Sequence, residues 1–511
     1  MTAEAVKQRF FDGFPVLKDK PVLRIPARDW VWPILFMLGL SLTGLRFPLG
    51  WILLFVCLVD RLMHDRYDFL IMLTIMFGGY NTVNSDDIYF THQRFIVFGC
   101  ILLMMFLRKY PLIKKLMLGW VAYFAVLLAM AMCSEESMSV QIMSMCNYLT
   151  VCWFVVPLAV FANRDFDMDT LIRRLFPYAM IFCLYYFLDS CIMCADFFMP
   201  RDLARTNQIK PTFNTIHIYP FGFWWLRLWP PGLYWLMLLV VPVIYKYRLP
   251  KWMWVAVILA LAVSRTFNMY LTLLFLFLLF LPKKTQIVRL CSIGFVLFAC
   301  LYLVDASMGT SDDGVTKLRI KSHIDQLFII QNAQDEEDMA KAGTGRAAQI
   351  IPKMIHLYEE NREWTGWGFL SWNSTNPKFY IHNELMLDPD YQDDLVTGVE
   401  CAPLELLLNA GYIGLAAGIV FYIFLWFCVR GLKYSAFFKA PLIAFTILGL
   451  TGLSGLIFPA GNLIVGLALG CVVLANRDHL PGYLSGRRRI IQNGSEPAVP
   501  AAASPHTDVR P

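Results

Sequence analysis

Charged side chains are scarce in this 511-residue sequence. Asp, Glu, Lys and Arg make up 16% of it, whereas soluble domains carry about a quarter. Apolar residues account for 58%, and the mean hydropathy is +0.54. The sequence contains 40 Phe, 24 Met and 15 Trp, side chains that are suited to contact with the lipid of a bilayer. The composition therefore excludes a soluble multi-domain enzyme and indicates a membrane protein.

Several motifs of cofactor chemistry are also missing. The sequence has no HExxH, no zinc-spaced Cys and His pairs, no Walker loop and no Rossmann glycine pattern. We therefore expect neither a metal nor a cofactor, and no nucleic-acid partner. Most of the 13 Cys lie inside apolar runs, where cysteine packs as a small hydrophobe, and this includes the pair Cys191 and Cys194. The charged residues 1–28 precede the first apolar run, so we expect no cleavable signal peptide.

Fourteen apolar runs are candidates for membrane crossing, since a spanning helix needs about 20 mostly apolar residues. They cover 30–45, 47–60, 69–81, 95–107, 116–133, 141–162, 175–196, 232–245, 252–264, 266–282, 286–305, 402–429, 437–456 and 461–475. The stretches 30–60 and 252–282 can be divided into membrane-crossing helices in other ways. The sequence thus predicts an all-α polytopic membrane protein with about 14 transmembrane helices (12 to 14).

The distribution of Lys and Arg supports this topology. If residues 1–28 are cytoplasmic and the runs alternate, the inward segments hold 29 of the 44 Lys and Arg, as the positive-inside rule requires. Residues 29–305 then carry helices 1 to 11, and 402–475 carry helices 12 to 14. Between them lies a large outward loop, 306–401, and residues 476–511 form a disordered cytoplasmic tail. Both termini are therefore expected in the cytoplasm.

A few outward cations stand outside the large loop. Arg205, Lys210 and Arg227 belong to a connection that also contains His217 and several Trp, and Arg265 lies between two closely spaced apolar runs. Charges at that depth are costly and tend to face a functional pocket. Guanidinium groups bind phosphate and diphosphate through paired charge-assisted hydrogen bonds. We expect these four cations to bind such a group, with His217 as a minor candidate for contact with an acceptor.

The large loop contains recognisable pieces. Gly345 and Arg346 open a stretch whose apolar residues recur at helical spacing, which predicts a short amphipathic helix. A glycine turn, TGWG, follows at 365–368, and then the pair His382 and Asn383. The chain re-enters the membrane as LELLLNAGYIG, from 404 to 414.

These pieces together resemble the O-antigen ligase and O-antigen polymerase superfamily. The shared features are Ser264 and Arg265 at the outward start of a helix, the late outward loop, Gly345 with Arg346, the GxG turn at 366–368, and LELLxxxGxxG at the re-entry. The resemblance covers roughly residues 205–430. It implies a metal-independent membrane glycosyltransferase that takes a glycan from undecaprenyl diphosphate at the outer face of the bacterial inner membrane. It also implies that arginines contact the diphosphate, for which Arg346 is a further candidate.

The sequence departs from the ligase pattern at the expected base. Ligases carry a His-Asn pair about ten residues before the first glycine of the re-entry motif, and here that place holds Glu400 and Cys401. His382 lies 18 residues further upstream. A carboxylate can accept the proton that a sugar hydroxyl must lose, so Glu400 is our preferred base and His382 the alternative. An acidic residue there resembles the polymerase branch more than the ligase branch.

The favoured function is therefore polymerisation of undecaprenyl-diphosphate-linked oligosaccharide repeat units into O-antigen, capsule or exopolysaccharide. Arg265, with Arg205 or Arg227, would neutralise the leaving diphosphate. The partners would be the lipid-linked donor, a glycan or lipid-linked acceptor, the bilayer and a chain-length regulator. Three alternatives stay open: a ligase that transfers glycan to lipid A core, a flippase or transporter of lipid-linked glycan, and a non-catalytic scaffold.

Overall fold

The computed structural model describes slightly more than half of the chain. The described residues are 21–44, 48–77, 86–107, 111–194, 215–218, 223–226, 346–371, 376–382, 393–399, 401–450 and 459–477, with the single positions 247, 292, 296, 299 and 374. Helices account for 79% of these residues. The protein is thus mainly helical, as the sequence predicts.

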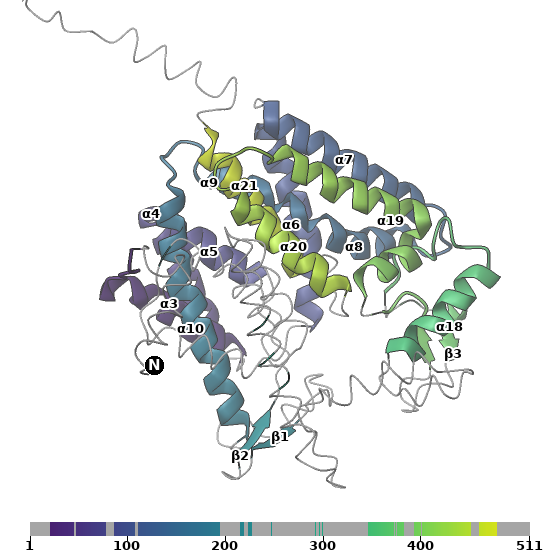
Figure 1. The fold of residues 1–511 in the computed structure, drawn as a ribbon, viewed down its shortest axis with the longest axis horizontal. Coiled ribbons are helices and arrows are strands. Elements are labelled where there is room, and N and C mark those ends of the chain that lie inside the picture. Colours follow the sequence, from purple (N-terminus) through teal and green to yellow (C-terminus); the bar gives the residue numbers. More distant parts are fainter. Residues whose placement is uncertain are drawn as a thin grey trace, which may run out of the picture.

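The N-terminal half of the described chain consists of helices joined by short connections (Figure 1). In chain order these are η1 (Ala27–Trp30), α3 (Val31–Gly44), α4 (Pro48–His64), α5 (Arg66–Phe77), α6 (Asp86–Leu107), α7 (Pro111–Ala131), α8 (Met138–Leu149), η2 (Thr150–Phe154), α9 (Val155–Val160) and α10 (Met168–Cys194). A two-stranded antiparallel ribbon, β1 (Thr215–Ile218) with β2 (Phe223–Leu226), comes next.

The C-terminal half begins with the large loop. It contains α18 (Arg346–Glu359), η3 (Pro377–Phe379) and an antiparallel pair, β3 (Tyr380–His382) with β4 (Asp393–Leu395). Three helices follow, α19 (Ala402–Cys428), α20 (Ser435–Leu450) and α21 (Pro459–Ala475). The amphipathic helix expected after Arg346 is therefore confirmed, and Pro352 lies within it.

Three helical segments of the described residues are long and apolar enough to cross a membrane: Leu112–Ala131, Met138–Val160 and Ala402–Cys428. Shorter apolar helices cover Arg94–Leu107, Ser435–Leu450 and Gly461–Ala475. Ten of the fourteen expected runs coincide with described helices, whereas 232–245, 252–264, 266–282 and 286–305 lie outside the described residues apart from isolated positions. The number of 12 to 14 spans stays a prediction.

Helices α7 and α19 form an antiparallel pair that Figure 1 shows side by side. Gly119 on α7 leaves room for the ring of Phe424, and Tyr123 stacks on Phe421 with ring centroids 4.7 Å apart. Further along, Leu127 lies beside Gly414. Residue numbers rise on one helix as they fall on the other, so the start of α19 lies beside the end of α7.

Helix α21 packs closely against the middle of the segment formed by α8, η2 and α9. A Cβ atom on Gly466 would lie 2.5 Å from the carbonyl oxygen of Val151, and one on Gly470 would overlap the carbonyl of Phe154. Glycines four residues apart let two helix backbones approach in this way, as is typical of membrane helices.

The described connections that are expected on the cytoplasmic side meet at one end of the bundle, which we call the cation-rich end. Its basic residues include Arg61, Arg66, Arg164, Arg174, Lys433 and Arg477. Arg174 on α10 binds Asp29 at 2.6 Å and Asp65 at 2.8 Å. Arg477 binds Asp165 at 3.0 Å, and the backbone N–H of Lys433 donates to Asn476 at 2.8 Å. Connections far apart in sequence are therefore held together there.

The connection expected on the opposite side, between α7 and α8, meets the large loop instead. The Oγ of Ser134 donates to the carbonyl of Trp367 at 2.6 Å, and Arg362 donates to the carbonyl of Cys133 at 3.1 Å. We call this the loop end. The α7–α8 connection, predicted to face outward, thus lies at a different end of the described bundle from the cation-rich end.

We expect Asp68 to make the stability of the cation-rich end depend on pH. It precedes the apolar run 69–81, and its carboxyl lies 4.0 Å from Arg61. Burial, followed by the charge of Asp65, raises the pKa of Asp68 to about 7, although Arg174 and Arg61 oppose this. An acid with a raised folded-state pKa favours folding when protonated, so its contribution falls as pH rises from about 4 to about 7.

We expect Asp68→Asn to remove that fall. The thermal midpoint of purified protein in detergent should decline less between pH 5 and pH 8 for Asp68→Asn than for the wild type. Asp165→Asn is the control, because its carboxylate is at the same end but 89% exposed. Equal pH profiles for the wild type and Asp68→Asn would contradict the assignment.

Candidate functional site

The glycine turn of the large loop docks directly on the re-entry helix. The backbone N–H groups of Trp367 and Gly368 donate to the carbonyls of Leu408 and Asn409 at 2.8 and 2.9 Å. In return, the N–H of Tyr412 donates to the carbonyl of Glu363 at 2.8 Å. These bonds run between backbones, so the turn and α19 hold each other wherever their side chains point.

The docking depends on glycine at both sides. Gly411 has φ 64° and ψ −170°, a backbone region that is essentially limited to glycine, and it interrupts α19. A Cβ on Gly411 would overlap the backbone of Trp364, and one on Gly366, at φ 73°, would lie 2.5 Å from the carbonyl carbon of Asn409. The kink frees the carbonyls of α19 that the turn then binds.

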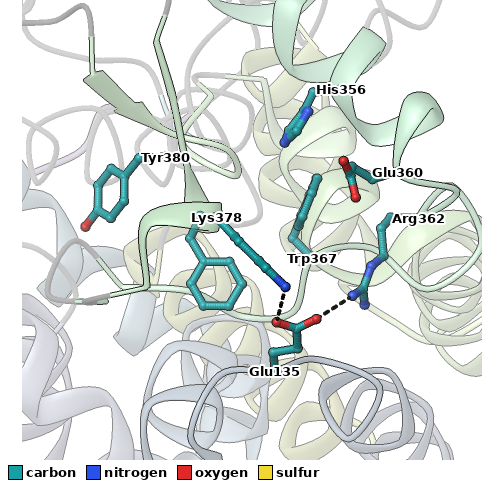
Figure 2. A pocket seen from close by; sticks show the side chains of 8 residues that line it. Glu135, His356, Glu360, Arg362, Trp367, Lys378 and Tyr380 are labelled. Carbon is teal, nitrogen blue, oxygen red and sulfur yellow. Dashed lines mark hydrogen bonds and ion pairs between the residues drawn. The ribbon is translucent and has the colours of Figure 1, made fainter.

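A pocket of about 210 Å³ lies beside this junction (Figure 2). Its lining combines two carboxylates, two cations and aromatic rings from three parts of the chain: Glu135, His356, Glu360, Arg362, Trp367, Lys378, Phe379 and Tyr380. Glu135 comes from the α7–α8 connection, whereas the other residues come from α18 and the loop after it. The pocket therefore exists only when the large loop is folded against the bundle.

Glu135 joins the two cations of the pocket. One carboxylate oxygen lies 3.3 Å from Nη2 of Arg362, and the other lies 3.3 Å from Nζ of Lys378. Figure 2 shows the two cations approaching the carboxylate from different sides. Lys378 is 71% exposed, so it can turn toward a ligand at little cost. The side chain of Arg362 is held more firmly, since it also binds the carbonyl of Cys133.

Trp367 forms the apolar part of the pocket. The imidazole of His356 stacks on its indole, with ring centroids 4.8 Å apart and planes 16° from parallel, and the guanidinium of Arg362 lies 5.8 Å from the ring centre. Trp367 is only 5% exposed, and its Nε1–H has no hydrogen-bond partner among the described residues. A buried indole N–H ordinarily finds an acceptor.

A buried polar layer holds the turn from the bundle side. Gln141 accepts from the N–H of Phe369 at 2.6 Å, and the ring of Phe369 packs edge-on against Tyr148. The hydroxyl of Tyr148 donates to Glu405 at 3.2 Å and accepts from Asn409 at 2.7 Å. Residues of α8 and α19 thereby fix the position of the turn that carries Trp367. This layer rests on polar residues inside apolar helices, where each must find a partner.

Lys353 anchors the segment that leads into α19. This side chain is fully buried on α18, and its Nζ donates to the carbonyl of Gly398. Val396 and Val399 belong to a small hydrophobic core that also contains Leu357 and Trp367. That segment ends at Val399, so α18 holds the chain directly before the predicted base, Glu400, which itself lies outside the described residues.

The site residues expected from the sequence fall mostly outside this description. Arg205, Lys210, Arg227, Arg265 and Glu400 lie outside the described residues. For the other three only the backbone is described. Arg346 begins α18, His217 pairs with Trp224 in the β1–β2 ribbon, and His382 pairs with Asp393 in the β3–β4 pair. None of the eight proposed roles is tested by these positions.

The pocket residues were not singled out by the sequence. Arg362 and Lys378 belong to no motif of the large loop, and Glu135 belongs to a short acidic connection, CSEES, more than 200 residues away. The one available signal was the TGWG turn, which places Trp367 and the backbone bonds to α19. Among the described residues, no group of three or more His, Cys, Asp or Glu could hold a metal ion.

Comparison with known proteins adds no assignment. No family model matches the sequence, and no curated protein matches it.

Proposed function

We propose that this protein is an integral-membrane glycosyltransferase that polymerises undecaprenyl-diphosphate-linked oligosaccharide repeat units at the outer face of the bacterial inner membrane. The observation that carries the proposal is the pocket around Trp367. Aromatic side chains beside paired carboxylates and cations suit a sugar, whose C–H groups pack against aromatic rings while its hydroxyls both donate and accept hydrogen bonds.

The orientation of the bundle supports an outer-face site. Short basic connections stay in the cytoplasm, and those of the described bundle gather at the cation-rich end. The pocket lies at the loop end, beside the α7–α8 connection. With the cation-rich end inside, the pocket faces the side on which a lipid-linked glycan is presented after export.

The proposed reaction needs no group beyond the chain and its substrates. The acceptor hydroxyl attacks the anomeric carbon of the donor sugar, and its proton passes to Glu400 or His382. The bond between the anomeric carbon and the diphosphate oxygen breaks, so undecaprenyl diphosphate leaves. Arg265, with Arg205 or Arg227, stabilises the charge that develops on it. Lys210, His217 and Arg346 belong to the substrate-binding set of this proposal.

The pocket has a defined place in this scheme. The carboxylates of Glu135 and Glu360 balance the charges of Arg362 and Lys378, so the pocket suits the hydroxyls of a sugar better than a diphosphate with several negative charges. We assign it to the glycan part of a substrate, and we leave the diphosphate to the arginines named above. Polymerisation is preferred to ligation because an acidic residue, Glu400, stands at the expected base position.

The proposal predicts the glycan phenotype of cells. Deletion of the gene should abolish long glycan chains, and wild-type protein should restore them. Arg265→Ala should fail to restore them at a normal protein level in the membrane, because the leaving diphosphate loses its counter-charge. Electrophoresis of extracted glycan measures the chain length. An unchanged length distribution after deletion would contradict the function, and wild-type chains with Arg265→Ala would remove Arg265 from the mechanism.

A further inference from the structure

The exposed surface of α19 forms an apolar stripe beyond its kink. The exposed residues recur every three or four positions and include no charge: Tyr412, Ile413, Ala416, Ile419, Val420, Ile423 and Phe427. The opposite side of α19 packs on α7. In a helix apolar enough to cross a membrane, such a stripe is the side that contacts acyl chains.

The stripe has marked ends. From Tyr412 to Cys428 the helix rises about 24 Å at 1.5 Å per residue, and Arg430 follows directly. The hydrocarbon core of a bilayer is about 30 Å thick. At the inner end, Lys439 lies 4.6 Å from the ring of Trp426, as expected of a lysine that reaches toward the interface. The upper end at Tyr412 therefore falls near the outer boundary of the hydrocarbon.

The large loop extends the stripe at that upper end. The hydroxyls of Tyr358 on α18 and Tyr412 on α19 are hydrogen-bonded, and the ring of Trp364 meets Tyr412 edge-on at 5.6 Å. Trp364 is 60% exposed, and Ile355, one turn before Tyr358, is 46% exposed. Ile355, Tyr358, Trp364, Tyr412 and Ile413 make a continuous exposed patch, which we call the aromatic edge.

We infer that the aromatic edge is embedded in the outer leaflet of the bilayer, so that α18 lies at the membrane surface as an interfacial helix. Tyr and Trp collect at this depth because their rings are apolar and their polar atoms reach water. The patch continues the lipid-facing stripe of α19, which identifies lipid as its occupant. The other side of α18 carries Leu357 into the loop core, and Glu360, directly after the helix, lines the pocket.

The arrangement has a consequence for the pocket. Since α18 supplies both the aromatic edge and pocket residues such as His356, embedding the edge fixes the pocket at the height of the lipid head groups. The inference about lipid contact does not depend on the proposed glycan chemistry, because it rests on the exposed apolar surface, on the length of α19 and, for the choice of leaflet, on the predicted topology.

Photocrosslinking in lipid nanodiscs tests the inference. p-Benzoylphenylalanine replaces Ile355, Ile419 or Glu360 in the full-length protein, and the nanodiscs contain phosphatidylcholine with an alkyne on one acyl chain. We expect lipid adducts with Ile355→p-benzoylphenylalanine at a yield within about twofold of that at Ile419. The yield at Glu360, which is exposed but faces the pocket side, should be at least fivefold lower.

Other outcomes overturn the inference. No adduct at Ile355 beside a strong one at Ile419 would place α18 in water. An adduct of Ile355 with a second protein copy would make the edge a protein interface, and no adduct at Ile419 would remove the stripe on which the inference rests. Equal yields at Glu360 and Ile355 would show that no face of α18 is selected. Tryptophan fluorescence gives an independent readout. Brominated lipids should quench a smaller fraction of the fluorescence of Trp364→Phe than of the wild type, and an unchanged fraction would contradict the inference.

Discussion

Replacement of Gly411 by alanine is expected to separate the large loop from the bundle. The backbone conformation of Gly411 costs about 1 to 3 kcal/mol for any residue with a Cβ. The added Cβ would also overlap the backbone of Trp364, which cannot move aside without breaking the bond from Tyr412 to Glu363. Overlap of that kind costs typically another 1 to 3 kcal/mol. We expect Gly411→Ala to lose about 2 to 6 kcal/mol and most of the glycan-polymerising activity.

Gly431→Ala is the matched control for this prediction. Gly431 also has a positive φ, 83°, but nothing lies within 4 Å of the position where a Cβ would stand. Alanine there bears the conformational strain without the overlap. Thermal midpoints and limited proteolysis of the loop 360–382, compared in the same detergent, measure the difference. Similar midpoints and cleavage rates for the two variants would show that the docking does not depend on the close approach at Gly411.

Arg362→Ala is expected to impair glycan transfer while leaving the fold in place. Its guanidinium is the better-held cation of the pocket, and a hydrogen bond to a charged group contributes about 1.5 to 3 kcal/mol. Loss of one such contact to the substrate corresponds to about a tenfold to hundredfold drop in kcat/KM. We expect a drop of that size, with a thermal midpoint close to that of the wild type, because the side chain is partly exposed.

Arg477→Ala provides an unusually close control. Arg477 donates Nη1 to a backbone carbonyl and Nη2 to a carboxylate, just as Arg362 does, but at the cation-rich end. Loss of its contacts should have a similar effect on stability and none on transfer. Assay of polymer length and initial rate with both variants separates the two roles. Equal activity of Arg362→Ala and Arg477→Ala would remove the pocket from the function.

The helical character of the protein and the position of ten helices could be predicted from the sequence. Apolar runs define membrane helices locally, so α19 and α21 began within two residues of the expected starts. Helix α6 shows the limit of this approach. It begins at Asp86, nine residues before the expected run. A search for apolar runs misses these first turns, because they contain polar residues such as Gln93 and Arg94.

The pocket could not be predicted in the same way, because it depends on contacts between distant segments. Glu135 and Arg362 are separated by 227 residues, and neither lies in a pattern with a period or a known spacing. What the sequence did indicate was the backbone chemistry at the junction. Gly366, Gly368 and Gly411 were noted as glycines of a turn and a re-entry, and all three have positive φ in the structure.

The most direct test of the account is incubation of the purified protein, in nanodiscs, with undecaprenyl-diphosphate-linked repeat units. The account predicts a ladder of products that differ by one repeat, with release of undecaprenyl diphosphate and no requirement for ATP. The same reaction with Arg362→Ala should give a ladder that is shorter or much slower to form. A single shift onto lipid A core would identify a ligase, and the absence of any product from active lipid-linked substrate would contradict a glycosyltransferase.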